Sequence, residues 1–168
     1  MLANSESESY VLDDLAAAAD APVYLVTVAA DDERSGCLVG FASQTGIDPA
    51  RFLVCLSKAN HTYRVAPRAE FMAVHLVSAK NTGLAELFGA ETGDEIDKFD
   101  RCRWRPGPHG VPVLIDAVAW FSGRILTRYD FGDHVGFLLA PVDGEAPADA
   151  PAVLRFHHVA AMRPGHPA

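Results

Sequence analysis

The sequence predicts a mainly β fold, a small and mostly antiparallel barrel with short helices at its periphery. Short runs rich in β-branched and aromatic residues recur along the chain, as at Val23–Ala29, Phe52–Ser57 and Glu70–Val77. The helical segments between them are short and do not alternate regularly with the strands, which argues against a doubly wound parallel sheet. A length of 168 residues is typical of one domain that buries its own core.

The composition excludes several classes of protein. Hydrophobic residues make up 49% and charged residues 21% of the chain, so we expect a globular core and not a disordered chain. The formal net charge of −8 repels phosphate on average, which excludes a nucleic-acid partner from our expectations. No apolar run reaches the roughly 18 residues of a membrane helix, so we expect no membrane partner.

The three cysteines form no C-x-x-C pair, and we expect neither a zinc site nor any other metal site. Cys37 and Cys55 lie in apolar runs and are expected to be buried thiols. The odd number of cysteines favours a reducing compartment. The first basic residue is Arg34, so no signal peptide is indicated, and we expect a cytoplasmic protein.

In the first half of the chain, residues 10–20 are expected to form a helix, because alanine favours helices and apolar residues repeat on one face. Strands are expected at Val23–Ala29, Cys37–Thr45 and Phe52–Ser57. A short helix over Asn60–Ala66 would begin with the Asn60 side chain as its cap.

In the second half, a strand at Glu70–Val77 is followed by a helix over Lys80–Ala90, capped by Asn81 or Thr82. One or two strands are expected within Val113–Tyr129. The last two expected strands are His134–Val142 and Val153–His157. We expect a domain over residues 10–160, with residues 1–9 and 161–168 as flexible tails.

Three histidines outside the candidate site have structural interpretations. His75 lies between Val74 and Leu76, so on a strand it would point away from its apolar neighbours, to the surface or an interface. His157 and His158 would point to opposite faces of the last strand and could not share one metal ion.

Two segments carry the residues from which we infer function. In Leu38–Thr45, a glycine inside a strand pattern permits another group to approach the backbone closely, and polar residues follow it. In Cys55–Thr62, a buried strand ends in a locally basic cluster, where Lys58 and backbone N–H groups could bind a phosphate. An ordinary strand-to-helix loop is the alternative for the second segment. Together the segments suit a flat heterocycle with a phosphate tail.

The chain resembles the flavin reductase family with the FMN-binding split barrel, which includes the reductase partners of two-component flavin monooxygenases. The resemblance covers residues 10–158 and depends on an ordered set of segments, none of which is specific alone. The set comprises Val23–Ala29, Val39–Thr45 followed by Ile47-Asp48-Pro49, Phe52–Thr62, Phe71–Val77, Leu84–Phe88, Asp97-Lys98-Phe99, Gly110–Leu114 and Tyr129–His134.

The resemblance implies a six-stranded antiparallel split β-barrel, normally a homodimer with flavin sites at its interface. It also implies which residues bind the cofactor. The ring and ribityl chain would be lined by Leu38, Val39, Gly40, Phe41, Ala42, Ser43, Gln44 and Thr45. The phosphate end would be held by Cys55, Leu56, Ser57, Lys58, Ala59, Asn60, His61 and Thr62. Lys98 and Phe99 match a loop that reaches the flavin, and His134 matches a histidine near the nicotinamide.

The activity implied is transfer of hydride from NAD(P)H to FMN or FAD, with the reduced flavin supplied to a partner monooxygenase. Such chemistry needs no protein nucleophile, which agrees with the lack of a triad motif. Many members carry hydroxyl side chains where this chain has Leu38, Gly40 and Phe41, so the choice between FMN and FAD stays open. Two alternatives use the same barrel: a protein that retains FMN as an electron carrier, and a reductase that binds the deazaflavin F420.

Overall fold

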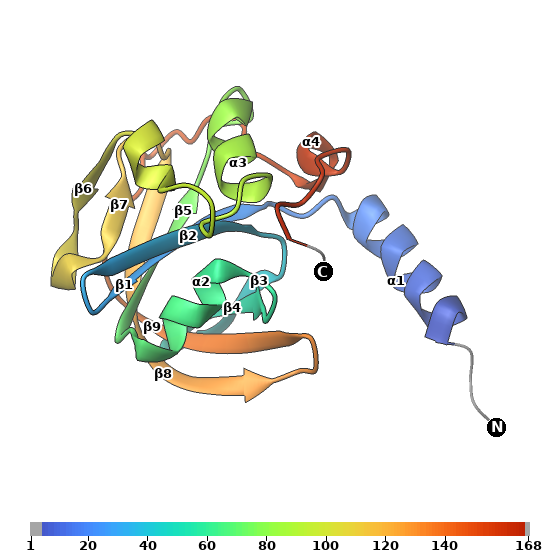
Figure 1. The fold of residues 1–168 in the computed structure, drawn as a ribbon. Helices are drawn as coiled ribbons and strands as arrows, with labels where there is room; N and C mark the ends of the chain where they lie inside the picture. The colour runs from blue at the N-terminus through green and yellow to red at the C-terminus, as the bar shows by residue number, and fades with distance from the viewer. Residues whose placement is uncertain (1–4, 167–168) are drawn as a thin grey trace.

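Seven strands pair into one curved antiparallel sheet in the computed structural model, which describes residues 5–166 (Figure 1). Their order across the sheet is β2-β1-β5-β8-β9-β4-β3. The strands are β1 (Tyr24–Ala30), β2 (Glu33–Val39), β3 (Ala42–Ile47), β4 (Ala50–Ser57), β5 (Phe71–Leu76), β8 (Ala119–Asp130) and β9 (His134–Glu145). Two further strands, β6 (Trp104–Pro106) and β7 (Pro112–Leu114), form a separate hairpin.

The two ends of this sheet meet, which closes it into a barrel. β2 and β3 stand at opposite ends of the strand order, yet only Gly40 and Phe41 separate them along the chain. The N–H of Cys55 in β4 donates to the carbonyl of Phe41 at 2.9 Å. With β2 and β3 counted as one interrupted strand, the barrel has six strands, as the resemblance implies. The sequence predicts a strand over residues 37–45 that runs into a loop. The structure instead interrupts the strand at Gly40 and Phe41 and resumes it as β3.

Helices lie at the periphery of the barrel. They are α1 (Ser5–Ala19), α2 (His61–Val65), α3 (Thr82–Gly89) and α4 (Phe156–Val159), with 3-10 turns at η1 (Ala66–Arg68), η2 (Lys98–Arg101) and η3 (Pro108–Gly110). The expected caps of α2 and α3 are confirmed. The Asn60 side chain accepts from the Thr62 N–H at 3.0 Å, and the Asn81 side chain accepts from the Leu84 N–H at 3.3 Å.

The barrel wall is buried on both faces along β1. Val26 and Val28 pack into a cluster inside the barrel with residues of β4, β5 and β9, whereas Leu25 packs outside it against Leu84 and Phe88 of α3. Successive side chains of a strand point to opposite faces, so a strand buried on both sides must be apolar at nearly every position. This explains the continuous apolar run predicted at residues 23–29.

Helix α1 extends away from the barrel (Figure 1). It begins at Ser5, whereas the sequence predicts a flexible tail over residues 1–9; of that tail, residues 1–4 lie outside the described residues. Tyr10, Val11, Leu12 and Leu15 are 63–69% exposed, so an apolar helix face has no cover within the described part of this chain.

The C-terminal region differs most from expectation. The strand expected at Val153–His157 is wrong: residues 153 and 155 form only isolated bridges, with Ser78 and Pro22, and α4 begins at Phe156. The imidazole of His158 accepts from the Arg155 N–H at 3.0 Å, which starts a helical turn in place of a strand ladder. As a result, the His157 and His158 rings lie 3.8 Å apart instead of on opposite faces. The expected loose tail is also wrong for residues 161–166, which pack beside α3.

His75 is buried, so the expectation of a surface or interface histidine is wrong. Its Nδ1 lies 3.0 Å from the Leu25 carbonyl, and its Nε2 accepts from the Leu114 N–H at 3.1 Å. The side chain points away from Val74 as alternation requires, but β7 covers that second face of the sheet. Burial lowers the pKa of His75 to about 4, so the imidazole is neutral at physiological pH.

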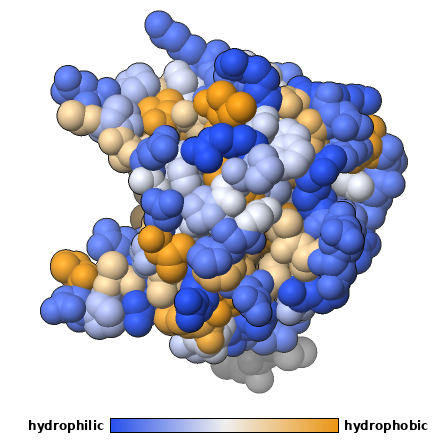
Figure 2. Space-filling view, turned by 90° about the vertical axis from the view of Figure 1, so that its left-hand side faces the viewer, coloured by the Kyte–Doolittle hydropathy of each residue, from blue (hydrophilic) through white to orange (hydrophobic). Residues whose placement is uncertain are grey.

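The face of the molecule opposite α1 is mainly hydrophilic. Figure 2 shows polar and charged side chains over most of this face, with only small hydrophobic areas among them. No helix among the described residues is long and apolar enough to cross a membrane. The exposed apolar residues of α1 lie on the other side of the molecule.

Replacing His75 with Gln is expected to flatten the pH dependence of stability between pH 6.5 and about 4. Because the folded pKa lies below the unfolded value, the unfolded state binds more protons in this window, and the stability of the wild type falls as the pH drops. The contribution is on the order of 3 kcal/mol, at roughly 1.4 kcal/mol per pKa unit. Urea unfolding at several pH values measures it, and equal pH slopes for both proteins would contradict it.

Candidate functional site

A cavity of about 480 Å³ opens beside the interruption between β2 and β3. The residues at the interruption and the end of β4 form one wall, and parts of α1 and α4 complete it. It is lined by Ala16, Ala19, Ala21, Val23, Cys37, Leu38, Val39, Gly40, Phe41, Cys55, Leu56, Ser57, Asn60, His134, Phe156 and Val159. The two segments from which the sequence predicts function therefore border a single cavity.

The wall combines fixed and accessible groups. Val39 and Leu56 are buried in the core, which holds the backbone of both segments in place. Gly40 is exposed, and a Cβ built on it would meet no atom within 4 Å. The main chain at Gly40 is therefore open to a ligand, which is the property that a flat ring lying against the backbone requires.

His134 lies at the edge of this cavity, where β9 begins opposite the end of β4. It pairs in register with Ser57, and its ring lies 5.1 Å from the ring of Phe41, tilted by 56°. Its Nδ1 is 2.9 Å from an oxygen of Asp133. This hydrogen bond lowers the pKa of the Asp133 carboxyl. The pair orients an imidazole beside the cavity, as the candidate role of His134 requires.

A second cavity of about 340 Å³ continues from the first. The two share five lining residues, Leu38, Ser57, Asn60, Phe156 and Val159. The far wall of the second cavity consists of Glu91 after α3 and residues of the segment 160–166. An elongated ligand can therefore occupy both cavities, with Ser57 and Asn60 beside their junction.

Lys58 lies elsewhere. Its Nζ binds both carboxylate oxygens of Asp130 at 3.0 and 2.9 Å, and it lines neither cavity. The backbone N–H of Lys58 donates to the Asp133 carbonyl at 2.9 Å, which fixes the turn. The lysine expected to bind phosphate therefore neutralises a carboxylate on the neighbouring hairpin.

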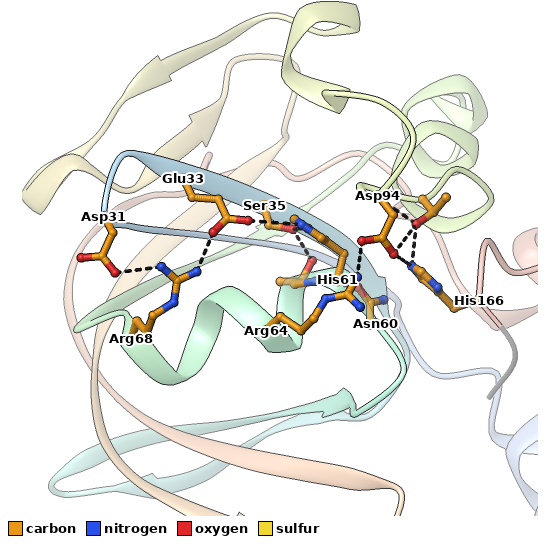
Figure 3. Close-up of polar contacts among 11 residues, drawn as sticks. Asp31, Glu33, Ser35, Asn60, His61, Arg64, Arg68, Asp94 and His166 are labelled. Atoms are coloured by element: carbon orange, nitrogen blue, oxygen red, sulfur yellow. Dashed lines mark hydrogen bonds and ion pairs between the residues drawn. The ribbon is translucent and has the colours of Figure 1, made fainter.

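His61 and Thr62 turn away from both cavities. The Nδ1 of His61 lies 2.8 Å from the Ser35 hydroxyl and its Nε2 lies 3.3 Å from Glu33 (Figure 3). Thr62 is fully buried, with its hydroxyl 2.9 Å from the same serine. Both residues attach α2 to β2 through Ser35. They point away from the cavities that Asn60 lines, because successive residues of a helix point in different directions around its axis.

Lys98 and Phe99 also lie outside the two cavities. The buried Nζ of Lys98 donates to the carbonyls of Gly36 at 3.1 Å and Phe88 at 3.0 Å, and burial lowers its pKa. Phe99 packs against Phe88, with ring centroids 5.8 Å apart. In this structure both side chains fasten η2 to the core, and the cofactor contact that the resemblance implies for Lys98 and Phe99 stays a prediction.

The remaining expected residues lie next to the cavities without lining them. Ser43, Gln44 and Thr45 are exposed on β3, at the end of the strand order, and Ala42 packs toward the barrel core. Ala59 lies in the turn before α2, where its N–H donates to the Ser57 hydroxyl at 3.3 Å. Sixteen residues of these two segments were expected to bind the flavin. Those that line the cavities are Leu38, Val39, Gly40, Phe41, Cys55, Leu56, Ser57 and Asn60.

The sequence analysis missed the peripheral walls. Ala16 and Ala19 of α1, Phe156 and Val159 of α4, and the segment 160–166 all line the cavities. The one signal for them was the apolar character of residues 152–162, which include Leu154, Phe156 and Met162. These walls could not be assigned from spacing, because α1 precedes both segments and α4 and residues 160–166 follow them far along the chain, with other strands and helices in between.

The arrangement suits the binding of a planar ring better than bond cleavage by a side chain. The first cavity offers an apolar wall, accessible backbone and one oriented imidazole. No group of three or more potential metal ligands occurs among the described residues. A cofactor that carries its own redox chemistry would fit such a site, since the protein then supplies only binding and orientation.

Comparison with known proteins also indicates a protein that binds a redox cofactor. A family model described as "Flavin reductase like domain" matches residues 17–163. The chain is 30% identical over 121 residues to "FMN reductase (NADH) RutF" from Bradyrhizobium diazoefficiens, covering 72% of this chain and 67% of that protein. It is 29% identical over 114 residues to "Probable flavin reductase" from Rhizobium meliloti, covering 66% of this chain but only 36% of that protein.

Solved structures share the fold. The structure titled "Streptomyces globisporus C-1027 NADH:FAD oxidoreductase SgcE6" superposes with a TM-score of 0.77 at 22% sequence identity, covering 89% of each chain. At this level of identity the likeness concerns the fold. It confirms the expected barrel architecture.

Replacing Lys98 with Met is expected to destabilise the protein by about 1–3 kcal/mol, because two buried carbonyls lose their donor. Lys58→Ala is the matched control: it removes an exposed ion pair, which costs about 1 kcal/mol or less. Urea unfolding measures both. If Lys98→Met left stability unchanged and weakened flavin binding, the structural role would be contradicted. The cofactor contact that the resemblance implies for Lys98 would then be supported.

Proposed function

The chain belongs to the flavin reductase-like family, and on that premise we propose that it is an NAD(P)H-dependent flavin reductase that acts on FMN. The observation that carries this proposal is the single cavity between the segments at Gly40 and Ser57, with His134 at its edge. The name of the Bradyrhizobium diazoefficiens relative supports FMN as the flavin and NADH as the reductant.

The residues of the first cavity fit a flavin ring. Phe41 offers an aromatic ring, the open main chain at Gly40 offers polar backbone groups, and the Cys55–Ser57 wall is largely apolar. Burial raises the pKa of the Cys55 thiol, so this wall stays neutral. When bound, FMN supplies the ring that accepts hydride from the nicotinamide. Backbone N–H groups near that ring would stabilise the negative charge that reduction creates.

His134 would position the nicotinamide. Its Nδ1 is held by Asp133, and within the described residues its Nε2 has no hydrogen-bond partner. That nitrogen is therefore available to a polar group of the second substrate, such as the nicotinamide carboxamide. Asp133 acts through His134 by fixing the ring orientation, and the Phe41 ring limits the tilt of the imidazole from the other side.

We propose that reduced flavin leaves the protein and is used by a partner monooxygenase. The exposed Gly40 and Phe41 beside the first cavity support exchange of the flavin with solvent. The reducing compartment suggested by the three free cysteines supports a location in the cytoplasm. A protein that retains FMN as an electron carrier is the competing function, and the experiment below separates the two.

The purified protein is expected to oxidise NADH or NADPH only when FMN or FAD is added, with many turnovers per protein. His134→Ala is expected to raise KM for the nicotinamide about tenfold, the effect of losing about 1.4 kcal/mol of binding, while flavin affinity is retained. Absorbance at the nicotinamide band gives the rates, and flavin fluorescence titration gives the affinity.

His109→Asn serves as a control, because His109 stacks on Phe71 outside both cavities and asparagine tolerates its left-handed backbone conformation. Failure of either nucleotide to reduce either flavin would refute the reductase. A yellow protein that dithionite bleaches but NAD(P)H does not would favour the electron carrier. Loss of flavin affinity in His134→Ala would contradict the assignment of that residue.

We also propose that the chain forms a homodimer through α1. Val11, Leu12 and Leu15 expose an apolar face on a helix that extends from the barrel (Figure 1). Exposed apolar surface of this kind marks an interaction site. Because Ala16 and Ala19 of the same helix line the first cavity, a second copy that packs against α1 would lie close to the flavin site.

The double variant Leu12→Asp/Leu15→Asp is expected to be monomeric, because charge on the apolar face opposes its burial. Size-exclusion chromatography with light scattering measures the mass, for which the wild type should give twice that of one chain. Ile115→Asp is the control, since Ile115 is also exposed but lies next to β7. A monomeric wild type, or a dimeric double variant, would contradict the proposal.

A further inference from the structure

The segment Ala160–His166, which we call the C-terminal strap, forms the far wall of the second cavity. Ala160, Met162, Pro164, Gly165 and His166 all line it. The strap follows α4 and lies beside α3, so a segment near the end of the sequence covers a route that starts at β2 and β4. From this position the strap limits the length of a ligand in the second cavity.

Backbone hydrogen bonds and the His166 side chain fasten the strap. The Met162 N–H donates to the Val159 carbonyl at 2.9 Å, and the Gly165 N–H donates to the Gly89 carbonyl at 3.1 Å. The Nε2 of His166 lies 2.7 Å from the Thr92 hydroxyl and 3.8 Å from an oxygen of Asp94. Because these contacts reach both α4 and the C-terminal end of α3, the strap holds a defined wall in place.

The contact between His166 and Thr92 belongs to a longer chain of polar groups. The Thr92 hydroxyl bonds to Asp94, and Asp94 forms an ion pair with Arg64 of α2 (Figure 3). Asn60, the N-cap residue of α2, lines both cavities. His166 therefore connects the strap to the helix beside the junction of the cavities.

The strap packs closely against α3. A Cβ on Gly89 would lie 2.9 Å from the Met162 sulfur, and a Cβ on Gly165 would lie 2.8 Å from the Ala90 carbonyl oxygen. Such distances leave no space between the strap and the helix. A ligand that extends past the second cavity must therefore displace the strap.

From this geometry we propose that the C-terminal strap selects the flavin by the size of its tail, admitting the mononucleotide FMN and excluding the adenylate half of FAD. The proposal rests on the proposed function, in which the flavin ring occupies the first cavity. The ribityl phosphate then enters the second cavity past Ser57 and Asn60. The combined space lies within the range of small-molecule sites, roughly 300–1,000 Å³, and the strap ends it.

The test compares variants that release the strap with one that keeps its contact. His166→Ala and Thr92→Val remove the hydrogen bond between these side chains, whereas Thr92→Ser retains the hydroxyl. Dissociation constants for riboflavin, FMN and FAD are measured by isothermal titration calorimetry on the full chain, and circular dichroism verifies folding.

The wild type is expected to bind FMN about tenfold more tightly than FAD, a difference of about 1.4 kcal/mol. In His166→Ala and Thr92→Val this ratio should fall about fivefold, the effect of one lost hydrogen bond, with riboflavin affinity unchanged. Thr92→Ser should resemble the wild type.

A wild type that binds FAD as tightly as FMN would overturn the proposal. An unchanged ratio in both releasing variants would also overturn it, as would an equal loss for all three flavins. Failure of the wild type to bind any of the three flavins is a different outcome: it would refute the proposed function itself, and the role of the strap with it.

Discussion

The short link of Gly40 and Phe41 closes the barrel, because it joins β2 and β3 from opposite ends of the strand order, and the location of the site depends on that closure. The hydrogen bond from the Cys55 N–H to the Phe41 carbonyl extends the pairing of β3 with β4 up to this link. Because β2 stops at Val39 and β3 starts at Ala42, two residues of main chain remain outside the regular pairing. The same interruption that completes the scaffold therefore exposes the backbone at Gly40 to a ligand.

Helix α2 divides the polar residues that follow β4 between two tasks. Asn60 caps the helix and lines both cavities, whereas His61 and Thr62 bind Ser35 behind the cavity wall. A run of polar residues that looks like one cluster in the sequence is thus separated by the turn of the helix. The buried contacts hold α2 against β2 and so position the cap at the junction of the cavities.

Several elements follow directly from local sequence. The apolar run at Val23–Ala29, the asparagine caps of α2 and α3, and the apolar end of β4 were predictable, because pattern and side-chain chemistry act over a few residues. Prediction failed where partners are distant. His75 is covered by β7, and Lys98 binds the carbonyls of Gly36 and Phe88. Neither partner lies close enough in the sequence to leave a local signal.

The sequence by itself determined a small barrel, its order of strands along the chain, and the two segments whose backbone borders the principal cavity. The tertiary structure decided which side chains within those segments face the cavity, that Lys58 pairs with Asp130, and that α1, α4 and the C-terminal strap supply the remaining walls. The physical reason is the range of the interactions: strand and cap formation depends on neighbours in sequence, whereas a cavity is enclosed by surfaces that only folding brings together.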